Sequence, residues 1–468
     1  MTLALRLAQR GDQVTLFESA NEIGGLASSW AIGEYTWDKH YHVTLASDEL
    51  TRRIVEELGL GDEFRWVETK TGFYTDGELI SMSNTMEFLN FPPLGMLGKL
   101  RLGATIFYAS RVKNWKRLER ISVEKWLTRL SGKKTFRKIW KPLLEAKLGN
   151  AYKETSAAFI WATIQRMYAA RNSGLKKEMF GYVRGGYARV LERFAEVLVE
   201  NGVEIRLNAR VQEIEKLGSG KFAVRQADAR RRNDARPLIL PGKTKYAAYA
   251  AAAVAAPGFS AGFMTQPGLP SQTVRQFPRK SYDNFDKVIL TCPSDVAARI
   301  LPQLKKTEKQ DLEHVRYQGI VCASVLMRCS LSEYYVTNIT DESPFTGIIE
   351  MTALVDKKEF GRNALVYLPK YVSPDDELFD KTDDEIREMF LEGLARMYPH
   401  FRRQDVLDFK VSRVRQVFPL PVLNYASGLA DMKTSVDGAY VVNSSHIVNG
   451  TLNVNETVAL AERFFATI

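Results

Sequence analysis

An acidic residue and a pair of glycines follow one short hydrophobic segment near the start of the sequence. The segment "QVTLFE" ends on Glu18, and the glycines are Gly24 and Gly25. A carboxylate at the end of a strand in a βαβ unit can accept hydrogen bonds from the vicinal hydroxyls of a ribose. Paired glycines let the backbone approach a flat or charged ligand, because a Cβ atom would intrude. These residues indicate a nucleotide site, although an acid after a strand is more often a turn residue.

The segment "NGTLNVNETVALAERF" near the other end supplies a complementary feature. Asn453, followed three residues later by Glu456, marks the start of a helix. A helix N-terminus presents unpaired N–H groups and a partial positive charge, so residues 450–455 suit a phosphate or the carbonyl edge of a flavin. Capped helices are common in all proteins. The combination of this turn with Glu18 and the glycine pair predicts a cofactor site.

Hydrophobic periodicity around these residues predicts an α/β fold. Residues 1–11 read as a short helix, and "QVTLFE" reads as a buried strand because apolar and β-branched residues fill it. A helix that leads into a parallel strand is half of a βαβ unit, so we expect its first strand before Met1. A helix over "RGGYARVLERFAEVLVENG" returns to strand alternation in "VEIRLNARVQEIEK", which indicates that the same sheet resumes.

Helices predominate between residues 84 and 200, where Ser122 is placed to cap the helix of "VEKWLTRL". Farther along, "GIVCASVLMRC" and "ALVYLPKYV" read as strands, and Thr382 with Glu385 forms a capping box. Residues 227–282 differ from both, because they are rich in Ala, Pro and Gly and have no stable period. We expect them to be a poorly ordered insertion in a hairpin between "KFAVRQ" and "FDKVILTCPSD".

The charge of the chain limits its partners. Its formal net charge is +10, and Lys and Arg cluster with aromatic residues in "KLRLGATIFYASRVKNWKRLER" and "RLSGKKTFRKIWKPLLEAK". Such clusters suit nucleic acid, an anionic membrane surface or an acidic substrate, and they are also typical of a solvated helix face. No nucleic-acid fold signature accompanies them, so we expect no nucleic-acid partner and leave peripheral membrane contact open.

Compartment signals favour the cytoplasm. The three cysteines cannot all pair and show no C-x-x-C spacing, which favours a reduced, cytoplasmic chain. We expect no signal peptide and no bilayer-spanning segment. Association with a membrane surface stays an alternative to a purely cytoplasmic location.

Four segments, in order, resemble the flavin-dependent amine oxidase superfamily. They are "TLFESANEIGGLASS", "RGGYARVLERFAEVL" with "VEIRLNARVQEIE", "FDKVILTCPSDVAARI", and "GAYVVNSSHIVNGTLNVNETVALAERF". The resemblance extends over nearly the whole chain except residues 227–282. Within the superfamily it is closest to protoporphyrinogen-oxidase-like and phytoene-desaturase-like members, and it implies flavin adenine dinucleotide (FAD) as the cofactor.

The resemblance assigns cofactor contacts residue by residue. It implies that Glu18 binds the adenosine ribose and that Gly24 and Gly25, followed by Leu26, pass beside the pyrophosphate and ribityl chain. It places the backbone of Val211 at the adenine. The remaining implied contacts lie in the C-terminal segment, near the phosphates and the isoalloxazine ring: Asn443, Gly450, Leu452, Asn453 and Val454.

Three departures from the family pattern are visible. "WDKHYHV" matches the stretch D-x-G-x-H through Asp38 and His42, so the resemblance adds His42 to the implied cofactor contacts, but His40 stands at the glycine position. The two histidines also fit one face of a strand, and with no third ligand in sight we predict no metal site. Leu26 stands where many amine oxidases have Arg, which favours the desaturase-like members.

The third departure is the start of the chain. The family begins with a strand and a G-x-G-x-x-G turn that holds the pyrophosphate, whereas this sequence opens inside the following helix. One interpretation is a late-assigned start or a truncation of a normal flavoprotein. The other is a degenerate copy that binds nothing. The otherwise coherent motifs favour the first.

The resemblance implies a Rossmann-like FAD-binding domain, interleaved with a substrate domain of helices and sheet, in a mixed α/β and α+β fold. The predicted FAD-binding parts are residues 1–83, 181–226, 283–300 and 416–468. The predicted substrate-domain parts are the helical residues 84–180 and the sheet residues 301–415, with residues 227–282 as the insertion.

The predicted activity is removal of a hydride from a C–H bond of a small molecule that is lipophilic or anionic, with flavin N5 as acceptor. We expect the substrate between residues 91–180 and 301–415, and no catalytic side chain is identified. Aromatic residues at helical spacing fit an apolar tunnel or simply a core, and Arg413 with Arg415 fits either a ligand contact or surface ion pairs. The aromatic residues considered are Trp115, Trp126, Trp140, Trp161 and Tyr168.

Two alternatives to an oxidoreductase remain. One is a redox-neutral flavin enzyme similar to UDP-galactopyranose mutase, which shares the glycine pair and would use a positively charged cleft. The other is a noncatalytic, flavin-free protein that binds acidic partners through its basic helices. Bound flavin in the purified protein discriminates the second alternative from both enzymes.

Overall fold

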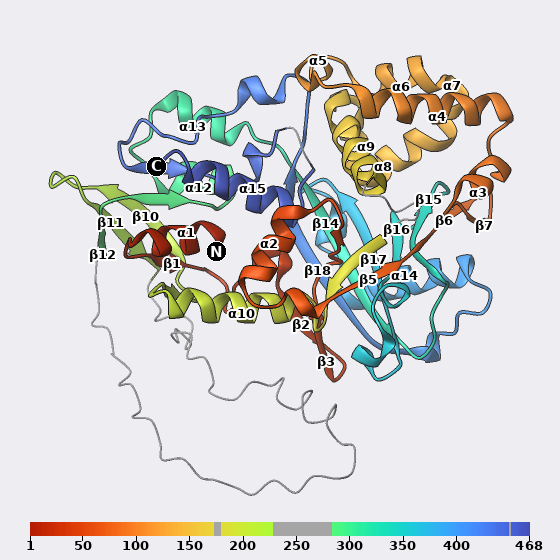
Figure 1. The fold of residues 1–468 in the computed structure, drawn as a ribbon, viewed down its shortest axis with the longest axis horizontal. Coiled ribbons are helices and arrows are strands. Elements are labelled where there is room, and N and C mark those ends of the chain that lie inside the picture. The colour runs from red at the N-terminus through yellow and green to blue at the C-terminus, as the bar shows by residue number, and fades with distance from the viewer. Residues whose placement is uncertain (173–178, 228–282, 449–450) are drawn as a thin grey trace, which may run out of the picture.

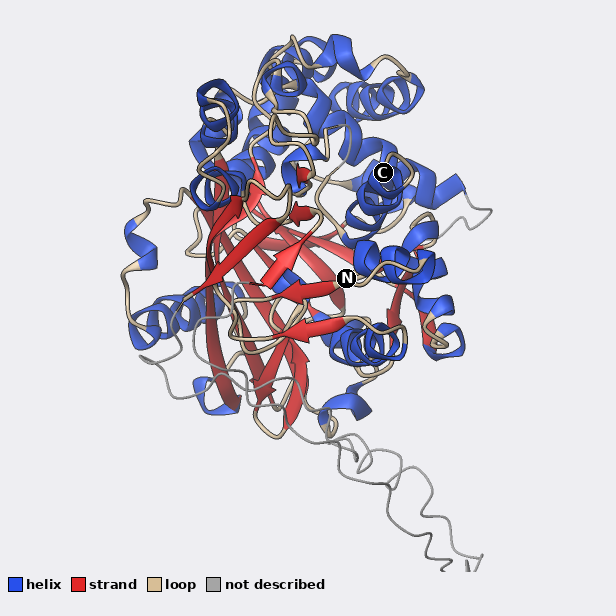
Figure 2. Ribbon diagram, turned by 90° about the vertical axis from the view of Figure 1, so that its left-hand side faces the viewer, coloured by secondary structure: helices blue, strands red, loops and turns tan. Residues whose placement is uncertain are grey.

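The computed structural model describes residues 1–172, 179–227, 283–448 and 451–468 and confirms the mixed α/β fold. Helices pack on both sides of the sheets, and the two termini lie near one another (Figures 1 and 2). The predicted insertion at residues 227–282 lies outside the described residues, apart from Ala227. The helices are α1 (Thr2–Arg10), α2 (Glu49–Glu57), α3 (Thr85–Asn90), α4 (Met96–Arg111), α5 (Trp115–Leu118), α6 (Val123–Ser131), α7 (Lys133–Thr135), α8 (Lys141–Leu148), α9 (Ala157–Asn172), α10 (Gly186–Glu200), α12 (Ser294–Ile300), α13 (Lys306–Glu313), α14 (Asp383–Met397) and α15 (Val454–Phe465).

Two parallel strand pairs lie on the side of the molecule that is predicted to bind FAD, which we call the nucleotide side. β1 (Thr15–Phe17) pairs with β9 (Glu204–Arg206), and β13 (Val288–Leu290) pairs with β19 (Ala439–Val441). The pairing of β1 with β9 confirms that the sheet resumes after α10. Among the described residues, no strand pairs with the second edge of β1 or of β13, and both strands line the same cavity. This open edge explains why β1, predicted to be buried, is only half-buried.

A third sheet, which is antiparallel, packs against the pair of β13 and β19. It contains β10 (Val211–Lys216), β11 (Phe222–Gln226) and β12 (Asp283–Phe285), and β11 pairs with both neighbours. The chain therefore leaves and re-enters this sheet around residues 228–282, as the predicted hairpin requires.

A seven-stranded sheet lies on the side that is predicted to bind the substrate, which we call the substrate side. Its strands, in spatial order, are β18 (Val406–Pro419), β14 (Tyr317–Met327), β17 (Ala364–Val372), β16 (Gly347–Glu350), β15 (Tyr334–Ile339), β6 (Lys70–Thr75) and β7 (Glu78–Ser81). β14 is buried along its whole length, because α14 packs on one face of the sheet and Trp37 with Phe180 packs on the other. β6 and β7 enter this sheet from within residues 1–83, and the domain boundaries themselves stay predictions.

Two small antiparallel sheets connect the sides. One is the hairpin of β2 (Ser29–Ile32) and β3 (Tyr35–Asp38), and the other contains β4 (Thr44–Leu45), β8 (Met179–Val183) and β5 (Phe64–Glu68). His40 and His42 lie between β3 and β4, in residues without regular structure. The expectation that they share a face of a strand is therefore wrong, because the strand ends at Asp38.

The helical part has a core of its own. Phe91, Val123 and Leu127 are fully buried in it. Ser122 caps α6 by accepting a hydrogen bond from Lys125 N, which confirms the predicted start of that helix. The structure also confirms the capping box of Thr382 at the start of α14 and the cap of Asn453 at the start of α15. None of the described helices is long and apolar enough to cross a membrane.

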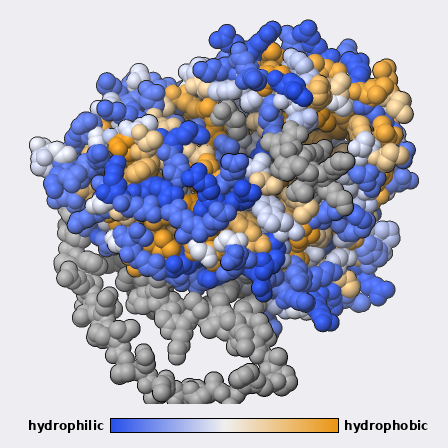
Figure 3. All heavy atoms as spheres, viewed as in Figure 1, coloured by the Kyte–Doolittle hydropathy of each residue, from blue (hydrophilic) through white to orange (hydrophobic). Residues whose placement is uncertain are grey.

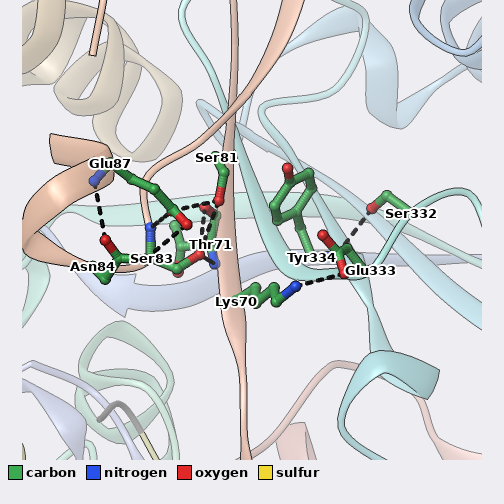
Figure 4. A network of polar contacts seen from close by, with 9 residues as sticks. All are labelled: Lys70, Thr71, Ser81, Ser83, Asn84, Glu87, Ser332, Glu333 and Tyr334. Carbon is green, nitrogen blue, oxygen red and sulfur yellow. Dashed lines mark hydrogen bonds and ion pairs between the residues drawn. The ribbon is translucent and has the colours of Figure 1, made fainter. Parts of the chain in front are cut away.

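A polar network attaches the helical part to the seven-stranded sheet (Figure 4). Glu87 in α3 accepts hydrogen bonds from Ser81 Oγ at 2.5 Å and from Ser83 N at 2.7 Å, and these bonds lower the pKa of its carboxyl. Ser83 Oγ in turn accepts from Thr71 N in β6 at 2.9 Å. Because these bonds link β6, β7 and α3, they fix the direction in which the chain enters the helical part.

Candidate functional site

One cavity of about 2480 Å³ lies between the nucleotide side and the substrate side. It exceeds the roughly 300–1,000 Å³ of ordinary ligand pockets, because it includes the space between β1 and β13. Ten of the predicted site residues line it, and the eleventh, Gly450, lies outside the described residues. The ten are Glu18, Gly24, Gly25, Leu26, His42, Val211, Asn443, Leu452, Asn453 and Val454. The structure thus brings them together, and their roles in cofactor binding stay predictions.

Glu18 immediately follows β1, as its sequence position predicts. Its backbone N–H donates to Arg206 O at 2.9 Å, and its Oε1 accepts from Ala20 N at 2.8 Å. Oε1 also accepts from Ser19 Oγ at 3.3 Å. No described group donates to Oε2, so this oxygen of a half-buried carboxylate is available to ligand hydroxyls.

Glycine occupies the two positions for different structural reasons. Gly24 has φ +107°, and a Cβ atom there would lie 2.4 Å from Leu191 Cδ1, so packing and backbone conformation both require glycine. Gly25 has φ +54°, but a Cβ atom there would meet no atom within 4 Å. Since Gly25 lines the cavity, this space is open to a ligand.

Asn443 is held by the protein itself. Its Nδ2 donates to Cys292 O at 2.8 Å, and its Oδ1 accepts from Ser445 N at 3.0 Å and from Ser445 Oγ at 2.6 Å. A ligand can therefore meet this residue through its backbone but not through the occupied amide. The first turn of α15 is better placed, because Leu452, Asn453 and Val454 all face the cavity.

The segment that resembles D-x-G-x-H has a structural and a cavity-facing part. Asp38 Oδ1 accepts from Tyr187 N at 2.9 Å at the start of α10, where a carboxylate opposes the positive end of the helix. His40 Nδ1 lies 3.2 Å from Leu26 O, and burial lowers the pKa of His40 to about 4. The expected hydrogen bonds of His40 are thus present, and His40 is neutral at physiological pH. His42 lines the cavity beside Tyr187, with ring centroids 5.1 Å apart.

The substrate side of the cavity is mainly apolar. Its wall includes Ile106 of α4, Leu143 and Leu144 of α8, and Ile160 and Ile164 of α9. Of the five aromatic residues considered for a tunnel, Trp140 and Tyr168 line the cavity, whereas Trp115, Trp126 and Trp161 pack in the helical core.

Arg413 and Arg415 are surface residues. Arg413 pairs with Asp383 at 2.5 Å, and Arg415 pairs with Asp380 at 3.3 Å. Neither lines the cavity, so of the two interpretations of these arginines, packing against surface acids is correct.

Sequence analysis missed three polar residues of the cavity. Tyr41 Oη and Tyr371 Oη lie 2.9 Å apart, and Lys147 Nζ lies 3.7 Å from the centroid of the Tyr371 ring. Tyr41 lies inside the segment "WDKHYHV" that was singled out, but Lys147 is one of many lysines in a basic stretch. No sequence signal distinguishes it from the solvated ones.

The walls fit a flavin dinucleotide. One connected cavity is bordered by a carboxylate with an available oxygen and by a helix N-terminus, and the space beside Gly25 is open. A ribose and an isoalloxazine edge require such groups, and the open space leaves room for a pyrophosphate. Glu18 and Val211 would hold the adenosine end, Gly25 would lie beside the pyrophosphate, and Leu452 to Val454 would hold the ring.

Comparison with known proteins gives a concordant result. A family model described as "Flavin containing amine oxidoreductase" matches residues 1–241 and 269–437. None of the curated proteins compared with the chain by sequence matches it significantly.

Solved structures share the fold. A putative protoporphyrinogen oxidase from Exiguobacterium sp. 255-15 has 16% identity and a TM-score of 0.68, over 100% of this chain and 95% of that one. An oxidoreductase from Methanosarcina mazei has 15% identity and a TM-score of 0.70, over 99% and 97%. A reduced UDP-galactopyranose mutase has 11% identity and a TM-score of 0.65, over 100% and 93%. At these identities the likeness establishes the fold alone.

Replacement of Gly25 by Ala tests the cofactor site. The matched control is Gly220→Ala in the turn between β10 and β11, where φ is +83° and a Cβ atom also meets nothing within 4 Å. Both variants should lose about 1 kcal/mol of stability, since both place alanine in the left-handed region. Only Gly25→Ala should lower the affinity for FAD, by about tenfold or more. Equal affinities of the two variants, measured by calorimetric titration, would remove Gly25 from the site.

Proposed function

Because this chain belongs to the flavin containing amine oxidoreductases, we propose that it binds FAD and oxidises a C–H bond of a lipophilic small molecule. The supporting observation is the single cavity that joins the nucleotide-side residues to the apolar wall of α8 and α9. A cofactor and a substrate in such a cavity meet without an intervening protein layer. The unpaired cysteines and the charge pattern support a cytoplasmic enzyme that contacts a membrane at its surface.

The bound flavin would supply a two-electron acceptor at N5, which oxygen or another carrier then restores. The protein binds and orients the reactants. Leu143, Leu144 and Ile160 exclude water from the substrate side, and the hydroxyls of Tyr41 and Tyr371 orient polar substrate atoms. Held by Glu18, Gly25 and the start of α15, the flavin would accept a hydride from a substrate C–H bond, and solvent would take the accompanying proton as a single bond becomes a double bond.

The mutase alternative fits the cavity less well. A nucleotide diphosphate sugar carries two negative charges and many hydroxyls, which call for several cations and polar side chains. On the α8–α9 wall the charged residues are Lys147 and Arg166, and Arg166 already pairs with Asp48 at 2.7 Å. The apolar majority of this wall therefore favours a lipophilic substrate.

An apolar surface lies on the outside of the same wall. Seven of the ten large apolar side chains that are exposed in the described chain lie between residues 86 and 108: Met86, Leu89, Met96, Leu97, Leu100, Phe107 and Tyr108. We call this set the α3–α4 surface. Figure 3 shows apolar atoms at the upper right, where Figure 1 draws α3 and α4.

The positively charged residues around the α3–α4 surface indicate an anionic partner. Arg101 lies beside Gly132 at the start of α7, Arg111 lies 5.0 Å from the centroid of the Phe107 ring, and Lys133 and Lys134 are exposed nearby. Apolar side chains ringed by cations are typical of proteins that insert into the surface of an anionic bilayer. We propose that the α3–α4 surface docks on anionic lipid. Ile106 of the same helix lines the cavity, so a lipophilic substrate has a short path inward.

The proposed oxidation has a direct spectroscopic test. The purified chain should show flavin absorption between about 300 and 550 nm, and the released flavin should be FAD by chromatography. Under anaerobic conditions, a lipophilic substrate should bleach these bands, and oxygen should restore them. A chain that stays colourless after incubation with FAD would contradict the proposed function and leave the noncatalytic alternative.

Vesicle sedimentation tests the membrane contact. The chain should sediment with vesicles of phosphatidylglycerol and phosphatidylcholine but not with phosphatidylcholine alone. Leu97→Ser with Leu100→Ser should weaken this binding by about tenfold or more, because two exposed leucines are removed. Val199→Ser on α10, a residue that is 46% exposed, is the matched control and should bind as the wild type does. Dimerisation through α4 without lipid binding would contradict the proposal.

A further inference from the structure

A lysine inside the cavity has no acidic partner. Lys147 lies on α8, and its Nζ atom lies 3.7 Å from the centroid of the Tyr371 ring and 5.1 Å from that of Phe418. Among the described residues, no carboxylate forms an ion pair with it, and burial lowers the pKa of Lys147 to about 7. The aromatic faces act in the opposite direction and favour the charged ammonium. Because Lys147 lines the cavity, the counter-ion that would stabilise its charged form has to come from a ligand.

The neighbouring groups do not supply that anion. Arg166, the other cation of this wall, is neutralised by Asp48, and the side chains next to Lys147 along α8 are Leu143 and Leu144. Lys147 is therefore the one amine of the described α8–α9 wall without an ion pair, and most of that wall is apolar. A ligand that matches this wall is apolar along most of its length and carries one negative charge.

The tyrosine pair provides a second donor at this point. Tyr41 and Tyr371 bond through their hydroxyls at 2.9 Å, which uses one of their two protons and leaves the other for a ligand. Burial raises the pKa of Tyr41 to about 12, so the hydroxyl stays protonated. One ammonium and one hydroxyl match the two oxygens of a carboxylate. A phosphate or diphosphate would leave negative charge uncompensated.

We propose that Lys147, together with the Tyr41–Tyr371 pair, binds the carboxylate of a lipophilic acid whose apolar chain lies along α8 and α9. This inference rests on the proposed function and names the class of its substrate. Lys147 then fixes one end of the substrate, and the distance from the carboxylate determines which C–H bond reaches the flavin side.

Calorimetric titration with dodecanoate and methyl dodecanoate tests this inference. The wild type should prefer the acid. Lys147→Met should weaken dodecanoate binding by roughly 30-fold or more and leave the ester unchanged, because only the acid needs a counter-charge. Lys147→Arg should retain most of the preference. Lys141→Met is the matched control on the same helix, since Lys141 is 43% exposed and pairs with Glu145.

Two results would overturn the inference. One is equal weakening of acid and ester in Lys147→Met, which would mean a packing role. The other is a wild type that carries flavin and does not prefer the acid. A wild type that prefers dodecanoate but never carries flavin supports the anion site and contradicts the proposed oxidation. Flavin absorption of the same samples therefore separates the two failures.

Discussion

The fold has to keep one large cavity open inside an otherwise close-packed chain. Protein interiors pack about as densely as organic crystals, and side chains that line a void lose the dispersion contacts of a filled interior. The void here separates the strands and helices of the nucleotide side from α8, α9 and the seven-stranded sheet. Apolar contacts do not cross the cavity itself, so the two sides are joined only around its rim, partly by the packing of Trp37 against the seven-stranded sheet.

Buried polar bonds at the rim of the cavity provide these connections. Tyr367 Oη in β17 donates to Asp38 O at 2.6 Å, while the carboxylate of Asp38 accepts from the start of α10. Arg166 of α9 pairs with Asp48 before α2 at 2.7 Å. Within the nucleotide side, Asn455 of α15 accepts from Leu50 N at 3.0 Å and so joins α15 to α2. In a low-dielectric interior such directional bonds are strengthened and define one geometry. They hold the two sides in one relative position around the cavity.

The parts of this architecture that depend on neighbouring residues were predictable from sequence. Caps at Ser122, Thr382 and Asn453 define helix starts through short-range hydrogen bonds, and the acid and glycine pair after β1 follow from the local chemistry of a strand end. The half-burial of β1 was not predictable, because it depends on what lies at its second edge.

Long-range relations escaped sequence reasoning for the same reason. Lys147 resembles its solvated neighbours until the fold places Tyr371, more than 200 positions later in the chain, beneath it. Arg415 alternates as a ligand-facing residue would, but Asp380 in a distant turn pairs with it at the surface. Charge along a helix or strand does not reveal which face the rest of the chain will cover.

Thermal unfolding of the chain at increasing FAD concentration tests most directly whether this cavity is a flavin site. A ligand that binds only the folded state stabilises it by about 2.7 kcal/mol at one hundred times its Kd. We predict that Tm rises continuously by several degrees with FAD and much less with riboflavin, which lacks the adenosine end. A Tm that does not change at millimolar FAD would contradict the assignment of the cavity.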